Sequence, residues 1–413
     1  MIEFGDTEGS TSRAAQQVMC RPRNRDFANR FVHTEHPSRS VIVVGTYPPT
    51  ECGLATYTAN VQATLQARGM TARVLRLDDD RALPSLPVVW NWCGDSPEHV
   101  SAAAAAANAF DAVLLQHEFG IYPGADGAAV VGFVEECRSP VFSVLHTILS
   151  NPSPNQRRIT EHVARHSLLT IVHTAVARAR LLENHDVDRS RVEIVPHGAF
   201  INLDGPPLMT SERPILLTWG LLGPGKGIEL GIEAVAVLRE CGLEARYVVA
   251  GQTHPNVFAR EGERYRRSLL QLSRDRHVDD LVEFDDHYRD WESLRALVRS
   301  ASIVLVPYES RDQVTSGVLV EAIATGKPVV ATAFPHAVEL ARSGALSVVP
   351  HGSPAAFSAA IAEILQQPER RRAMCRAAAA EAVRHDWTSV GKRLDDLISQ
   401  GLRVSAFEQE MVV

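Results

Sequence analysis

The chain has 413 residues, 45% hydrophobic and 22% charged, which is long enough for two domains that each bury a core. The net charge of -7 argues against bulk binding of nucleic acid, and no apolar run is long enough to cross a bilayer. The six cysteines show neither Cys-x-x-Cys nor Cys/His spacing, so neither a disulfide framework nor a structural zinc site is indicated.

Residues 1–38 are polar and carry an arginine-rich stretch at 21–30 without sustained periodicity, which predicts a disordered N-terminal tail. The first residues lack the basic-then-apolar order of a secretory signal, so we expect a cytoplasmic protein. Peripheral contact of basic residues with the inner membrane face is an open alternative to a solvated surface.

Residues 39–205 alternate between apolar runs and helix-like segments. This alternation is typical of βαβ units in a doubly wound parallel sheet. We expect strands at 40–45, 112–116, 141–146, 169–172 and 192–195, with helices over 101–110 and 127–137.

A segment rich in proline and turn formers, 201–213, predicts a linker to a second domain, 206–390, with the same alternation. The expected strands are 215–218, 246–250, 281–284, 303–306, 328–331 and 346–349. The sequence therefore predicts an α/β fold of two Rossmann-like, doubly wound domains that face each other across a cleft at the carboxyl ends of their strands.

The stretch 303–332 combines a buried strand, a polar loop and a helix start made of small residues. Free backbone N–H groups near Ser316–Val318 and the positive end of the helix dipole favour an anion such as a diphosphate. Glu321, one turn into the helix, can accept hydrogen bonds from a ribose, and Gln313 can reach a sugar. An ordinary turn with a serine cap is the alternative interpretation.

With this motif and the glycine loop at 219–227, residues 40–395 resemble the retaining GT-B glycosyltransferases, in particular the large GT4-type family, glycosyl transferases group 1. The resemblance implies an acceptor domain at 39–205 and a domain for a nucleotide diphosphate sugar at 206–390. It also implies that the C-terminal helix and tail, 391–413, pack back toward the first domain.

The resemblance implies that Lys226 neutralises the diphosphate leaving group, which a flexible ammonium on a glycine loop suits. The family usually has an arginine where this chain has Leu221, so either Lys226 acts alone or a cation such as Arg311 substitutes. The donor-binding residues implied are Gly53, Gly223, Lys226, Gln252, Gln313, Ser316, Gly317, Val318 and Glu321.

Gln313 stands where the family pattern has the first of two glutamates eight positions apart. Glutamine can form hydrogen bonds with sugar hydroxyls but supplies no negative charge, so it cannot serve as a carboxylate nucleophile. Retaining members of this fold are thought to react on one face, with a donor phosphate oxygen taking the acceptor proton, and that route tolerates glutamine.

On the acceptor side, the resemblance implies a histidine beside the transferred sugar, and His117 is the first choice because it follows a buried strand. Together with Lys226 and Glu321 it forms the predicted catalytic set. Thr56, Glu118, His146 and His197 are expected on the acceptor side, although a histidine at a strand end is more often structural.

No metal ion and no other cofactor is expected. Asp78–Asp80 and Asp285–Asp286 resemble metal-binding acidic pairs, but solvated acidic runs are the favoured interpretation. Lys226 and the helix amides would then provide the charge stabilisation that a cation supplies in other glycosyltransferases.

The sequence thus predicts a retaining, metal-independent glycosyltransferase that moves a hexose, of mannose or glucose type, from a nucleotide diphosphate sugar to a saccharide or glycolipid acceptor. A nucleotide-sugar epimerase, a phosphorylase-like enzyme of the same fold and a non-catalytic, two-lobed sugar-binding protein remain alternatives. The oligomeric state is not indicated.

Overall fold

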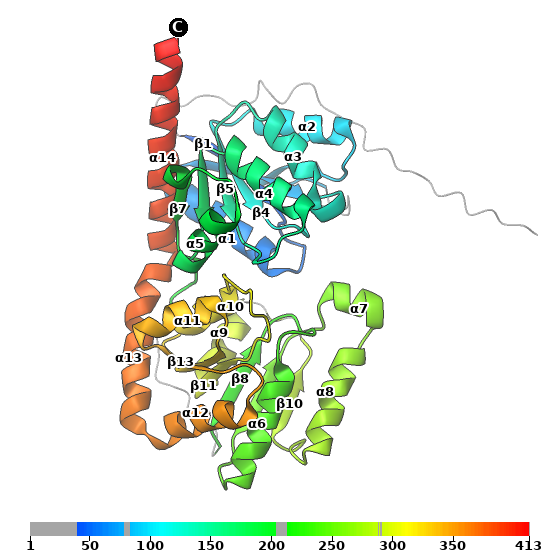
Figure 1. The fold of residues 1–413 in the computed structure, drawn as a ribbon, viewed down its shortest axis with the longest axis vertical. Coiled ribbons are helices and arrows are strands. Elements are labelled where there is room, and N and C mark those ends of the chain that lie inside the picture. Colours follow the sequence, from blue (N-terminus) through cyan, green and yellow to red (C-terminus); the bar gives the residue numbers. More distant parts are fainter. Residues whose placement is uncertain (1–38, 78–82, 204–212, 288, 290, 413) are drawn as a thin grey trace, which may run out of the picture. The chain divides into compact units, whose positions relative to one another are not determined.

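The computed structural model describes residues 39–77, 83–203, 213–287, 289 and 291–412. Two parallel sheets, of seven and six strands, organise this part of the chain (Figure 1). The predicted tail at 1–38, the acidic run at 78–80 and most of the predicted linker lie outside the described residues. The expected fold of two Rossmann-like sheets is confirmed.

The first sheet has the order β3-β2-β1-β4-β5-β6-β7 and contains all five strands predicted for the first half. Its strands are β1 (Ser40–Gly45), β2 (Thr71–Leu77), β3 (Val88–Trp92), β4 (Ala112–His117), β5 (Val141–Leu145), β6 (Leu169–Val172) and β7 (Val192–Ile194). Its helices are α1 (Gly53–Ala67), α2 (Pro97–Ala107), α3 (Ala129–Glu136), α4 (Pro154–His166) and α5 (Ala175–Asn184), with short 3-10 turns at Ala125–Gly127 and Arg189–Arg191.

The second sheet has the order β10-β9-β8-β11-β12-β13, and its six strands are those predicted from the sequence, with ends shifted by a residue at most. They are β8 (Ile215–Trp219), β9 (Arg246–Ala250), β10 (Val282–Asp285), β11 (Ile303–Val306), β12 (Val329–Thr332) and β13 (Leu346–Val349). The helices are α6 (Ile228–Glu240), α7 (Pro255–Glu261), α8 (Arg264–Asp275), α9 (Trp291–Ser300), α10 (Gly317–Ala324), α11 (Pro335–Leu340), α12 (Pro354–Gln366), α13 (Pro368–His385) and α14 (Trp387–Val412), with a 3-10 turn at Ala341–Ser343.

The central strands are apolar on both faces because helices cover each sheet on both sides. Val41–Val44 of β1 and Ile303–Val306 of β11 have no exposed surface. Parallel strands buried in this way bring all their carboxyl ends to one edge of the sheet. The loops at that edge are therefore where each half can present polar side chains.

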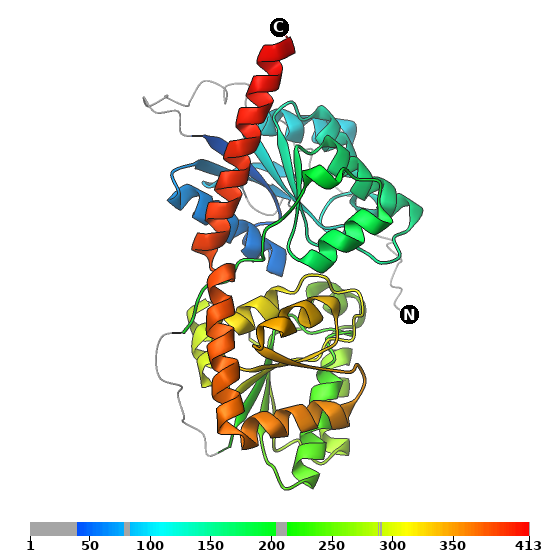
Figure 2. The same ribbon diagram turned by 60° about the vertical axis from the view of Figure 1, so that its left-hand side comes forward.

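Helix α14 belongs to the first half in space although it ends the chain (Figure 2). Trp387, Leu394 and Ile398 are buried against residues of β1 and α1, in one core cluster. Arg68, the residue directly after α1, donates from Nε to Asp395 Oδ2 at 2.9 Å. The helix starts with Asp386 as its cap, since the Asp386 carboxylate accepts from the Thr388 N–H at 3.1 Å.

Contacts between the two halves gather on α5 and α11. The carboxylate of Glu339 in α11 accepts hydrogen bonds from the N–H groups of Ala175 and Val176, at 2.9 and 2.8 Å. Thr174 Oγ1 donates to the carbonyl of Val314 at 2.9 Å. The N-terminus of α5 is thus capped by a side chain from the other half.

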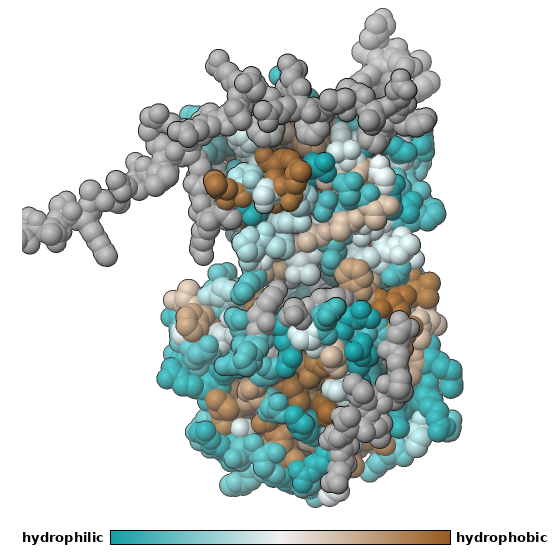
Figure 3. All heavy atoms as spheres, turned by 180° about the vertical axis from the view of Figure 1, so that it is seen from behind, coloured by the Kyte–Doolittle hydropathy of each residue, from teal (hydrophilic) through white to brown (hydrophobic). Residues whose placement is uncertain are grey.

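Within the described residues, no helix combines the length and the apolar character that crossing a membrane requires. On the face shown in Figure 3, hydrophobic residues form several separate groups between hydrophilic ones.

Candidate active site

A pocket of about 630 Å³ lies at the carboxyl ends of strands from both sheets. Of the site residues predicted from the sequence, His117 and Gly223 do not line it. The others do, namely Gly53, Thr56, Glu118, His146, His197, Lys226, Gln252, Gln313, Ser316, Gly317, Val318 and Glu321. Residues far apart in the chain thus meet around one volume of a size typical of ligand pockets.

The start of α10 forms one edge of this pocket. Ser316 caps the helix, because its Oγ accepts from the Leu319 N–H at 3.2 Å. The Ser316 N–H donates to His336 Nδ1 at 2.9 Å, so it is not the free anion-binding group that the sequence suggested. The N–H groups of Gly317 and Val318 have no partner within the helix, and both residues face the pocket. They are the amides that can hold an anion.

Because Gly317 has no side chain, the two halves can approach each other closely at the start of α10. A Cβ at this position would lie 3.1 Å from His197 Cε1, tighter than an ordinary contact. His197 follows β7, so a ring from the first half rests against the helix start of the second half.

Glu321 lies one turn further along α10. Trp219 Nε1 donates to Glu321 Oε2 at 3.3 Å, which orients the carboxyl group toward the pocket that both residues line. Removal from water raises the pKa of Glu321 to about 7, and the bond from Trp219 only partly opposes this shift. A ligand hydroxyl that donates to the Glu321 carboxyl group would replace some of the hydrogen bonds from water that burial removes.

Gln313 lines the pocket as a neutral group. Its side-chain amide donates to the carbonyl of Thr315, which holds the loop ahead of α10. The N–H of His336 donates in turn to the Gln313 carbonyl at 3.2 Å. Gln313 is therefore fixed beside the helix start by both its side chain and its backbone.

The glycine loop after β8 places Lys226. Gly227 has φ of 66°, and a Cβ there would lie 1.8 Å from the Pro307 carbonyl oxygen, so only glycine permits this close approach to the end of β11. Lys226 Nζ lies 4.6 Å from the centre of the Tyr308 ring. Among the described residues no carboxylate is paired with Lys226, which leaves its charge available to a ligand.

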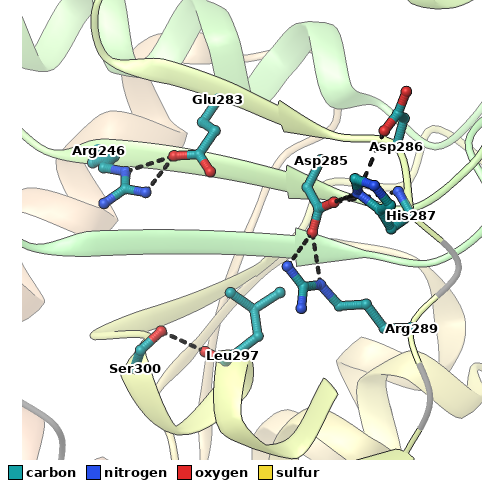
Figure 4. Close-up of polar contacts among 8 residues, drawn as sticks. All are labelled: Arg246, Glu283, Asp285, Asp286, His287, Arg289, Leu297 and Ser300. Atoms are coloured by element: carbon teal, nitrogen blue, oxygen red, sulfur yellow. Dashed lines mark hydrogen bonds and ion pairs between the residues drawn. The ribbon is translucent and has the colours of Figure 1, made fainter. Parts of the chain in front are cut away.

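A second cation at the pocket comes from Arg289, which the sequence interpretation missed (Figure 4). Arg289 follows β10 and donates from Nε to Asp285 Oδ2 at 2.6 Å, while His287 Nδ1 lies 2.8 Å from Asp285 Oδ1. Burial alone would raise the pKa of Asp285, but these partners outweigh it and lower the pKa. Arg311, the cation suggested by sequence, is exposed and is not among the lining residues.

Leu221 lines the pocket beside Lys226, at the position where the family pattern has an arginine. The sequence did contain a signal for Arg289: it follows Asp285, at the end of a predicted strand, by four residues, a spacing at which opposite charges often pair.

The wall from the first half is built on the N-terminus of α1 and on histidines. Cys52 caps α1, and the Ala55 N–H donates to its Sγ at 3.3 Å. Tyr57 is 3% exposed, and its ring lies 4.8 Å from the rings of both His146 and His197. Tyr57 lines the pocket, and its buried hydroxyl has no hydrogen-bond partner among the described residues.

Glu118 and His146 complete this wall. Glu118 accepts from the hydroxyl of Thr147 and from the N–H of Phe119, the latter at 3.0 Å. Burial raises the pKa of Glu118, against the effect of those two bonds. His146 Nε2 lies 2.8 Å from Gln116 Oε1, and burial, together with neighbouring histidines, lowers the pKa of His146 well below its usual value.

The first-choice histidine, His117, lies behind this wall. It is 1% exposed, and its ring packs 5.1 Å from that of Phe119 and 6.2 Å from that of Tyr122. Burial lowers the pKa of His117 to about 4. Because alternate residues of a strand point to opposite faces, the last residue of β4 points into the core. His146 and His197 are the histidines with which the first half lines the pocket, and the second half adds His254 and His287.

Comparison with known proteins shows what the chain is similar to. Residues 204–381 match the family model described as glycosyl transferases group 1. The curated relatives include D-inositol 3-phosphate glycosyltransferases from Corynebacterium kroppenstedtii, 28% identical, and Corynebacterium efficiens, 29% identical. These matches cover 61% and 64% of the chain, and they span 58% and 66% of the two relatives.

Solved structures show the same fold. The complex of Anabaena Alr3699/HepE with UDP has a TM-score of 0.68 at 17% identity, covering 88% of this chain and 100% of that one. Sucrose-phosphate synthase from Thermosynechococcus elongatus has a TM-score of 0.71 at 16% identity, with 88% and 98% covered. The chain is therefore similar to glycosyl transferases group 1 over residues 204–381, and its fold is that of the solved GT-B structures.

Proposed function

We propose that the chain is a retaining glycosyltransferase that moves a hexose from a nucleoside diphosphate sugar to a hydroxyl acceptor without a metal ion. The observation that carries the proposal is the second-half wall of the pocket, where Lys226, Glu321 and the amides of Gly317 and Val318 meet. A cation and two free amides suit a diphosphate, and a carboxyl group suits a sugar hydroxyl. The group 1 family match and the relatives named as glycosyltransferases support the same assignment.

In the proposed reaction the acceptor hydroxyl oxygen bonds to the anomeric carbon as the bond from that carbon to the diphosphate oxygen breaks. The hydroxyl proton passes to a phosphate oxygen of the leaving group, so no carboxylate nucleophile is needed and Gln313 is tolerated. Lys226 and the amides of α10 stabilise the negative charge that develops on the diphosphate. Glu321 and Gln313 orient the donor.

The acceptor in this proposal is uncharged. The lining residues that the first half supplies include no Lys or Arg in the part of the chain that the structure describes. Burial, with the neighbouring His173, lowers the pKa of His197 well below its usual value, as it does for His146, so both rings stay neutral. A phosphate group on the acceptor would face Glu118 without a balancing cation, which is costly in a buried site.

A thermal-shift screen of the full chain against UDP, GDP and ADP sugars tests the donor site, because a ligand of the native state raises the melting temperature. The donor found should then give transfer with retention, seen by NMR as the same anomeric configuration in donor and product. An inverted product would overturn the retaining assignment. Isomerisation of the donor without an acceptor would instead identify an epimerase.

Two further measurements test metal independence and the absence of charge on the acceptor. EDTA should leave transfer unchanged, and a loss restored by magnesium or manganese would overturn metal independence. Matched acceptors, such as inositol with inositol 3-phosphate and glucose with glucose 6-phosphate, should show transfer to neutral members. Preference for the phosphorylated members would overturn the claim about acceptor charge while leaving the donor assignment intact.

A further inference from the structure

Two neighbouring helices of the first half carry a group of potential metal ligands, which we call the His-Glu cluster: Glu135 of α3 and His162 and His166 of α4. The helices α3 and α4 pack side by side (Figure 1). The cluster shares no residue with the lining of the pocket, and no step of the proposed transfer uses it.

The two histidines are four residues apart on one helix, so they lie on the same face. Their rings stack with centroids 4.2 Å apart and an angle of 22° between the planes. One ligand atom from each residue of the cluster lies within 4.8 Å of the other two. Two imidazoles at this spacing on a helix are a recurring way to bind zinc.

Glu135 supplies the third ligand. Its Oε1 lies 2.9 Å from His162 Nε2, an ion-pair contact. Ligand atoms about 2.0–2.2 Å from a tetrahedral zinc ion are about 3.3 Å apart. The Glu135–His162 separation is close to this value, and the ligand atoms of all three residues lie within 4.8 Å of one another.

The surroundings of His166 also suit a metal. His166 Nδ1 lies 2.9 Å from the His162 carbonyl oxygen, the second contact that commonly orients a metal-binding histidine, and its Nε2 is left as the ligand atom.

We propose that the His-Glu cluster binds one divalent transition-metal ion of the Zn²⁺ type through His162, His166 and Glu135. Nitrogen ligands with one carboxylate favour zinc, copper or nickel over magnesium and calcium. Because Glu135 and the histidines come from different helices, the bound ion would join α3 to α4.

The test uses the full chain, stripped of metal and titrated with ZnCl₂ by isothermal calorimetry, and compares the native protein with the H162A/H166A variant. The native protein should bind one Zn²⁺ more than the variant, and E135Q should weaken this site by about tenfold or more. Zn²⁺ should raise the melting temperature of the native protein more than that of the variant. MgCl₂ should neither bind at this cluster nor raise the melting temperature of the native protein above that of the variant.

H277N is the matched control, since His277 is exposed and lies outside the cluster, and asparagine tolerates its positive φ of 56°. Its zinc stoichiometry should equal that of the native protein. Cu²⁺ bound to the cluster should show two nitrogen ligands by electron paramagnetic resonance. Equal zinc binding by the native protein and by a folded H162A/H166A or H166A variant would overturn the proposal.

Discussion

The two walls of the pocket differ in the charges that their lining groups carry. The wall from the second half carries Lys226, Arg289 and the free amides of α10, whereas the first-half wall presents Tyr57, Glu118 and neutral histidines. In the proposed function, this difference places the anionic part of a bound substrate at the second-half wall and leaves the first-half wall for uncharged hydroxyl groups. The first three predictions below test this difference, and the fourth tests the contact between the two halves.

The largest effect is expected from Lys226→Ala. Losing this ammonium removes a donor aimed at the leaving diphosphate, which should lower kcat about 100- to 1000-fold. The matched control is Lys392→Ala, because Lys392 is exposed and pairs with Asp396 at 2.7 Å. Steady-state kinetics with saturating donor separate the two variants, and a kcat within threefold of the native value would contradict the assignment.

Glu321→Ala should come next, with donor affinity reduced about 10- to 100-fold, as expected when a charged hydrogen-bond acceptor is removed. Glu321→Gln keeps an acceptor oxygen and should lose less. Isothermal titration with the donor, or with its nucleoside diphosphate, measures the difference. Equal affinities for the native protein and Glu321→Ala would remove Glu321 from the donor site.

The pH dependence of stability gives a third test. The pKa of Glu321 in the folded protein, about 7, lies above its ordinary value of 4.5. Its stabilising contribution is therefore complete below about pH 4.5 and is lost as the pH rises through 7. The melting temperature of Glu321→Gln relative to the native protein should rise between pH 5 and pH 8, by about 2–4 °C per kcal/mol. A constant difference would show that the carboxyl group is not shifted.

The smallest effect is expected from Glu339→Ala, which removes the acceptor of the Ala175 and Val176 N–H groups at the start of α5 but leaves the Thr174 cap and the charges of both walls unchanged. Loss of an N-terminal cap typically costs about 1 kcal/mol. Denaturant unfolding measures this cost, with Glu369→Ala as a control on an exposed carboxylate paired with Arg372. A large rise in the donor KM would show that the contact between the halves also shapes the donor wall.

The sequence was sufficient for the fold wherever strands are apolar on both faces. Strands β2 and β3 escaped prediction because Arg73, Arg76 and Asn91 interrupt their apolar pattern at one side of the sheet. Arg76 is nevertheless 3% exposed, with its guanidinium held by the Asn91 side chain and the Pro48 carbonyl. Partners of this kind come from distant segments and cannot be read from local periodicity.

The site was harder to predict in its details. Sequence spacing was enough to predict that Lys226, Gln313 and Glu321 lie at one pocket, because each follows a strand of the same sheet. It could not reveal that His117 points into the core, since one step along β4 reverses the direction of a side chain. It also could not show that His336 uses the N–H of Ser316, a contact between residues 20 positions apart.

The position of α14 has a consequence for synthesis of the chain. Residues of β1 share a buried cluster with Leu394, Leu397 and Ile398, which are translated only after the whole second half. Until those residues arrive, one face of the first sheet lacks its apolar cover, so a nascent chain stalled before Trp387 presents that face to chaperones or to other chains. The first sheet is thus completed only after the second sheet has been synthesised.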